Sequence, residues 1–218
     1  MAVEFPIHRF RRESSMRFQL GNARFEAADG SAEIHELEDL VEFHQRFMDP
    51  RTGSRIYQAA IGDATRDVPL HVVINDTLDA GVMTFAGAYR TRIEINSGRL
   101  FIMRERPQDD RFTQTRFALL LEVQNATRWD DLCRIQDGAI ACTLTRDQVI
   151  RATQELEYHG YRRACDSDRE IIQNGQAGSG SFRAVCPWRD VDHYLQAQSA
   201  SGHSARIGDR YDSWMLDE

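Results

Sequence analysis

The chain has 218 residues, a length that favours one domain with an appendage. Its hydrophobic fraction of 41% is enough for one sizeable core, and its formal net charge of -7 argues against nucleic-acid binding, which needs a positive surface. No apolar stretch in the sequence is long enough to span a bilayer. We therefore expect neither nucleic acid nor a membrane as a partner.

The basic residues are unusual, because all 27 are arginine and the sequence contains no lysine. A GC-rich genome shifts codons toward arginine, and this is one explanation. Lysine is also the side chain that acetylation and ubiquitination modify. A chain without lysine would suit a bacterial protein that works inside a eukaryotic cell or near a ubiquitin ligase, so a host protein of the ubiquitin system is one expected partner.

The N-terminal sequence "MAVEFPIHRFRRESS" has basic residues but no apolar region after them. This pattern is not that of a cleavable signal peptide. We expect secretion by a route that needs no such signal, with action in a host or target cell, or otherwise a cytoplasmic location.

The first half of the chain predicts a helix followed by short strands. Residues 1–30 are expected to form an N-terminal extension with a hairpin at Gly21-Asn22. Apolar residues at helical spacing predict a helix from Ser31 that stops before Pro50. The following elements are a short helix at 57–61 and the strand segments "LHVVIND", "GVMTFAGAY", "RTRIEIN" and "GRLFIMRE".

The second half predicts three more helices. The first runs from Asp109 or Asp110 to about Arg128, and the second is long, begins at Thr145, and is kinked or locally ended by Gly160. The Gly- and Ser-rich stretch 174–181 is predicted to be a linker. The last elements are a short helix with Pro187 in its first turn and a loose polar tail after residue 199.

Together these elements predict an α+β fold, with a small sheet packed against several helices. The predicted division is an extension at 1–30, a main α+β domain at 31–174, and a linker, short helix and tail at 175–218.

One stretch, "FALLLEVQNATR", resembles the active-site helix of zincin-type metallopeptidases, which carries H-E-x-x-H after a small sheet. In that motif two histidines bind zinc and the glutamate activates water. Leu121 stands at the first histidine, Glu122 at the glutamate and Asn125 at the second histidine. The resemblance therefore implies a zincin-like domain, over roughly residues 68–170, that has lost its zinc ligands, and we expect no metal and no cofactor.

The resemblance also places a further ligand on a later helix, where Glu155, Glu157 and His159 occur. A repurposed hydrolase cleft would use Glu122, Asn125, Glu157 and His159 as its catalytic residues. The alternative is structural: Glu122 pairs with an arginine of a neighbouring element, and Asn125 braces a loop. Two other histidines, His35 and His44, are expected on a solvated helix surface.

Four cysteines, at positions 133, 142, 165 and 186, form no C-x-x-C pair and are interpreted as reduced thiols. Three functions follow from these features. The first is a bacterial secreted effector or toxin-like protein that acts on or binds a protein target. The second is a cysteine-dependent hydrolase or deamidase, and the third is a non-enzymatic interaction protein of the cytosol.

Overall fold

A mixed six-stranded sheet and seven helices make up the part of the chain that the computed structural model describes, residues 8–12, 15–27, 31–75, 86–89, 91–96, 111–181 and 186–216. The expected α+β class is confirmed. The strands are β1 His8–Arg12, β2 Ser15–Leu20, β3 Ala23–Ala27, β4 Leu70–Asn75, β5 Ala86–Tyr89 and β6 Arg92–Asn96. The helices are α1 Ser31–Met48, α2 Arg55–Ala64, α3 Arg111–Ala126, α4 Trp129–Ile140, α5 Arg146–Gln173, α6 Val191–Ala200 and α7 His203–Trp214.

The strands are ordered β1-β2-β3-β4-β6-β5 across the sheet. The central strands β3, β4 and β6 are parallel, whereas β1, β2 and β5 pair antiparallel to their neighbours. Parallel neighbours need a crossover connection, and α1 and α2 provide it between β3 and β4. The predicted strand at 98–105 lies outside the described residues.

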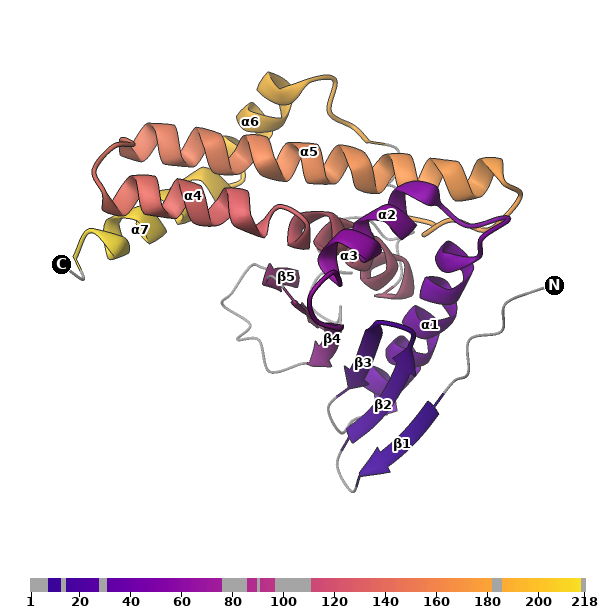
Figure 1. Cartoon of the computed structure of the whole chain (residues 1–218). Coiled ribbons are helices and arrows are strands. Elements are labelled where there is room, and N and C mark those ends of the chain that lie inside the picture. The colour runs from indigo at the N-terminus through magenta and orange to yellow at the C-terminus, as the bar shows by residue number, and fades with distance from the viewer. Residues whose placement is uncertain are drawn as a thin grey trace.

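Helices α1 and α3 pack against each other and against the strands, so they cover the same face of the sheet. Helices α2 and α5 pack on α3 in turn, and Figure 1 shows α5 running the length of the molecule beside α4 and α7. The main core lies between the sheet and α1 and α3. Its largest fully buried side chains include Phe25, Phe43, Phe47, Tyr57 and Phe117.

The N-terminal residues differ from the extension that we expected. Strands β2 and β3 form the predicted hairpin, with Gly21 in the left-handed region at its turn (φ 53°). Strand β3 alternates buried and half-buried side chains and pairs with β4. Because the inward-facing Phe18 and Phe25 are buried in the main core, residues 15–27 belong to the main sheet.

Helix α5 begins where the sequence predicts. The Thr145 hydroxyl accepts a hydrogen bond from the backbone N–H of Gln148, and the Gln148 side-chain oxygen accepts one from the backbone N–H of Thr145, which is a capping box. The predicted break at Gly160 is absent, because α5 continues for 28 residues. Helix α4 was not predicted. It packs with α5 and α7 around a second small apolar cluster, formed by Ala139, Val149 and Ile207.

The C-terminal region is more ordered than a linker and a loose tail. Ser179 is buried, and its backbone N–H donates to the Asp168 carboxylate on α5, which holds the Gly- and Ser-rich stretch against that helix. Helix α6 begins after the N-cap Asp190 rather than at Pro187. The expected loose tail forms α7, which buries Ile207. Within the described ranges, no helix combines the length and apolar character that crossing a membrane would require.

Candidate functional site

The zincin-like stretch lies on α3, the helix between the sheet and α5. Glu122 is buried, with 6% of its surface exposed, and its Oε2 accepts a hydrogen bond of 3.1 Å from Asn125 Nδ2. The two residues are three apart, so they lie on the same side of the helix. Asn125 therefore uses its amide N–H on the glutamate, and Leu121 before them carries no donor atom for a metal.

Asn125 also lies where α3 packs against α5. A Cβ atom added to Gly160 of α5 would overlap Asn125 Oδ1. The glycine leaves room for the Asn125 amide in the position that it occupies. The position that would hold a second zinc-binding histidine is thus filled by a side chain packed between two helices.

A second polar group lies on α5 around Glu157. Its Oε2 is 2.8 Å from His203 Nε2 of α7 and accepts a hydrogen bond of 3.4 Å from the Tyr194 hydroxyl of α6. The Arg206 guanidinium, which can only donate, lies 3.3 Å from His203 Nδ1. In neutral His203 the proton therefore lies on Nε2 and is donated to Glu157.

Tyr194 of α6 lies close enough to both Glu122 and Glu157 for their charges to affect its pKa. Its burial, followed by the negative charges of Glu157 and Glu122, raises the pKa of its phenol far above the ordinary value. Tyr194 is thus a neutral hydroxyl that donates to a carboxylate. The three helices α3, α5 and α6 bring Glu122, Asn125 and Glu157 to the same region of the fold.

His159, the fourth predicted site residue, does not join them. It is exposed, and its ring lies 5.6 Å from the ring of its neighbour Tyr158. Two residues along a helix point to nearly opposite sides, which separates His159 from Glu157. Glu155, the other residue considered with it, accepts a hydrogen bond of 2.8 Å from Arg151 Nε.

These contacts do not resemble a metal centre. Among the described residues, no group of three or more His, Cys, Asp or Glu side chains is arranged to hold a metal ion. Glu157 and His203 form a carboxylate–imidazole pair, but the other ring nitrogen of His203 faces Arg206. That nitrogen is therefore poorly placed to take a proton from a substrate.

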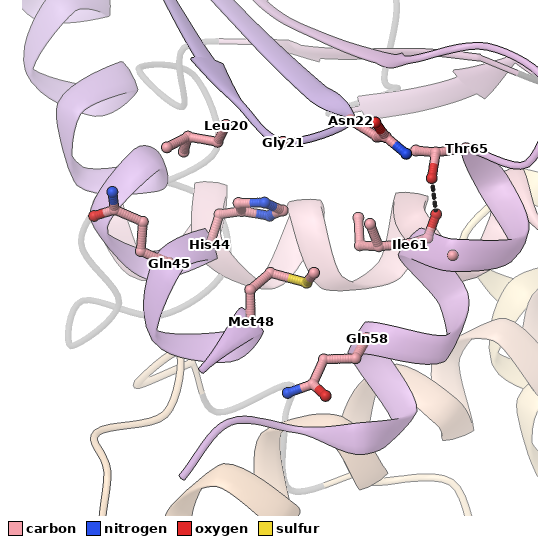
Figure 2. Close-up of a pocket in the computed structure, with 10 residues that line it drawn as sticks. Leu20, Gly21, Asn22, His44, Gln45, Met48, Gln58, Ile61 and Thr65 are labelled. Carbon is pink, nitrogen blue, oxygen red and sulfur yellow. Dashed lines mark hydrogen bonds between the residues drawn. The ribbon is translucent and has the colours of Figure 1, made fainter. Parts of the chain in front are cut away.

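A separate pocket of about 320 Å³ lies between α1, α2 and the turn of the β2–β3 hairpin. Figure 2 shows the apolar side chains of Leu20, Met48 and Ile61 around this pocket together with polar ones such as Gln45 and Gln58, and the His44 ring between α1 and α2. His44 Nδ1 lies 2.8 Å from the Tyr57 hydroxyl. Burial lowers the pKa of His44 to about 4. The expected position of His44 on a solvated surface is wrong, whereas His35 is exposed as expected.

The cysteines also fall into distinct environments. Cys142 is exposed and Cys133 is half-buried, whereas Cys165 is buried in α5 and Cys186 is half-buried beside it. The thiols of Cys165 and Cys186 share a hydrogen bond. No C-x-x-C spacing announces this pair, because the two residues meet only through the return of the chain after α5.

The residues that sequence reasoning missed all belong to the C-terminal helices or to such long-range pairs. Tyr194 and His203 lie 37 and 46 positions from Glu157. Tyr194 falls within the short helix that the sequence predicts after Pro187, and the helical pattern of residues 203–214 was the available signal for His203. Comparison with protein-family models, with curated proteins and with solved structures finds no match for this chain.

Proposed function

We propose that this chain is a bacterial secreted effector or toxin-like protein that binds a protein target in a host or rival cell, on a zincin-like core without zinc chemistry. The observation that carries the proposal is the Asn125 amide, which occupies the second histidine position of the motif, bonds Glu122 and packs against Gly160. Leucine supplies no ligand, and an amide is a poor one for zinc.

The arrangement of elements supports the zincin-like part of this proposal. The resemblance leads us to expect a small sheet, then a helix with the glutamate, then a later helix with a polar side chain directed at the same region. Strands β4 to β6, helix α3 with Glu122, and helix α5 with Glu157 follow in that order. In a zinc peptidase the metal joins the side chains of the two helices. In this chain, hydrogen bonds and packing hold the corresponding helices together.

Metal analysis of the purified protein tests this part. We expect far less than one zinc per chain after dialysis against zinc. The informative variant is Glu122→Gln, whose amide oxygen can still accept from Asn125 and so preserves the packing. Zinc bound one to one by the wild type, whether or not Glu122→Gln retains it, would overturn the claim that the motif is inactive.

The absence of lysine supports action inside a eukaryotic cell, where ubiquitination would otherwise mark the chain. Arg66, Arg134 and Arg151 are 74%, 75% and 61% exposed and form surface ion pairs with Asp63, Asp131 and Glu155. Such pairs contribute little to stability. Replacing all three with lysine therefore adds amines to the surface while retaining charge and fold.

We expect this triple variant to have a shorter half-life than the wild type in a eukaryotic cytosol, and proteasome inhibition to restore it. The matched control replaces the same residues with glutamine, which changes the charge without adding an amine. Equal half-lives of the lysine variant and the wild type would refute selection against lysine. They would favour a codon-bias origin and the alternative of a cytosolic interaction protein.

The second candidate function is a cysteine-dependent hydrolase. The lowered pKa of the Cys186 thiol is the observation that favours it. The groups that shift the pKa of this thiol are Cys165, Arg162, Asp166 and Arg169. No histidine belongs to this set, so the described contacts supply a stabilised thiolate without a general base. The geometry for nucleophilic hydrolysis is therefore less complete than the geometry for a binding protein.

A further inference from the structure

Cys165 and Cys186 are neighbouring cysteines, of which the first is buried and the second is partly accessible to solvent. Cys165 lies in the main core with no exposed surface, and Cys186 packs against that core while remaining half-buried. A hydrogen bond between their thiols is the largest influence on the pKa of each, so the two side chains lie within hydrogen-bonding reach of one another. Residues 166–185 separate them in the chain, so a bond between them would close a loop across α5.

The face of α5 beside Cys186 carries two arginines. Arg162 lies one turn before Cys165, and Arg169 lies one turn after it. The positive charge of Arg162 favours the thiolate of Cys186. In turn, the charge of Cys186 is the largest cause of the raised pKa of Arg162. The nearby Asp166 opposes this effect, but Arg169 Nη1 donates to its carboxylate at 2.6 Å.

The two thiols differ in their readiness to ionise. The hydrogen bond from Cys165 and the charge of Arg162 lower the pKa of Cys186 to about 7, against the opposing effect of burial. The hydrogen bond with Cys186 and burial raise the pKa of Cys165 well above its ordinary value. Since a thiolate is the reactive form, Cys186 is the thiol that would react first with an oxidant. Cys165 would then react with the oxidised Cys186.

The backbone at Cys186 is also unusual. Its φ is 57°, in the left-handed region that non-glycine residues seldom adopt, and Pro187 follows directly. Beyond it, Trp188 packs edge-on against Tyr161 of α5, with ring centroids 6.4 Å apart, and against Tyr194 of α6 at 5.6 Å. This packing on both helices holds the segment and keeps Cys186 over Cys165.

From this arrangement we propose that Cys165 and Cys186 form a reversible disulfide, with a hydroperoxide as the oxidant. In the first step the Cys186 thiolate attacks one peroxide oxygen, the O–O bond breaks, and hydroxide leaves, which gives a sulfenic acid. In the second step the Cys165 sulfur attacks that sulfur, an S–S bond forms, and water leaves. In total, two thiols lose two electrons and two protons, and hydrogen peroxide becomes two molecules of water.

The disulfide would join Cys186, and the segment that leads from it into α6 and α7, to the C-terminal half of α5. This segment supplies Tyr194 and His203, the partners of Glu157. The disulfide is therefore a modification site that would act on the same region of the fold as the candidate cluster. The inference does not depend on the proposed function, since it requires neither a protein target nor secretion.

The arrangement of arginines makes a direct test possible. Trypsin separates the four cysteines into the peptides 129–134, 135–146, 164–169 and 184–189. The full-length protein is treated with a small excess of hydrogen peroxide, blocked with N-ethylmaleimide and digested without reductant. We expect the loss of two of the four free thiols, one cross-linked pair of peptides, 164–169 with 184–189, and complete reversal by dithiothreitol.

Three variants sharpen the result. Cys165→Ser should stop at the sulfenic acid of Cys186, which dimedone traps, and Cys186→Ser should leave Cys165 unoxidised. The control combines Cys133→Ser with Cys142→Ser and should retain the cross-link, while circular dichroism verifies that each variant is folded. Cross-links through Cys133 or Cys142, or no cross-link in folded wild type, would overturn the proposal.

Discussion

Acid should weaken the fold through His44, the buried imidazole on α1. Its side chain is 3% exposed, and burial holds its pKa at about 4 against an ordinary 6.5. Above pH 6.5 the imidazole is neutral in both the folded and the unfolded chain, so it adds no pH dependence. Below pH 6.5 His44 becomes protonated in the unfolded chain but stays neutral in the folded chain. Stability therefore falls as the pH falls from 6.5 to about 4.

The size of the effect follows from the two pKa values. One pKa unit corresponds to about 1.36 kcal/mol. The unfolded state gains about 2 kcal/mol of proton binding relative to the folded state at pH 5, and about 0.2 kcal/mol at pH 7. The His44 contribution alone should thus lower the free energy of unfolding by about 2 kcal/mol between these two pH values.

Urea unfolding followed by tryptophan fluorescence at both pH values measures this change. In His44→Gln, an amide replaces the titrating ring beside Tyr57, so the pH-dependent loss should be smaller than in the wild type by about 2 kcal/mol. The control is His35→Gln on the same helix, where the histidine is 67% exposed. Equal pH dependence in the wild type and His44→Gln would refute the assignment of His44 as a buried neutral imidazole.

Three further substitutions test the packing and capping of helices by urea titration. Gly160→Ala should destabilise the protein by about 1–3 kcal/mol, because the methyl group overlaps Asn125 Oδ1. Gly62→Ala on α2, where a Cβ meets open space, should stabilise it by about 0.5–1 kcal/mol; the same sign for both would contradict the close helix crossing. Thr145→Ala should cost about 1 kcal/mol through loss of the α5 cap, and an unchanged unfolding midpoint would argue against that cap.

Local signals account for the elements that were predicted correctly. The Ser31 helix, the hairpin at Gly21, and the start of α5 at Thr145 each depend on capping, turn or periodicity within a few residues. Helix α4 was missed because its only buried residue is Ala139. Its few apolar contacts are made with the start of α5 and with residues of α7, and the α7 residues lie far along the chain.

The candidate site divides in the same way. Glu122 and Asn125 were found together because they are three residues apart on one helix, a spacing that any helix brings into contact. Glu157 was found, but its partners Tyr194 and His203 were not, since neither helix spacing nor a motif relates them. His159 was grouped with Glu157 by proximity in the chain, and the helix directs the two apart.

The amino-acid sequence by itself determined the α+β class, the absence of lysine, and the order of Leu121, Glu122 and Asn125 on one helix, because these depend on composition, period and residue identity. Only the tertiary structure decided that residues 15–27 complete the sheet, that His44 is buried, and that Cys165 meets Cys186. Each of these depends on contacts between residues distant in sequence. The return of the chain over α5 creates such contacts, and no local preference encodes them.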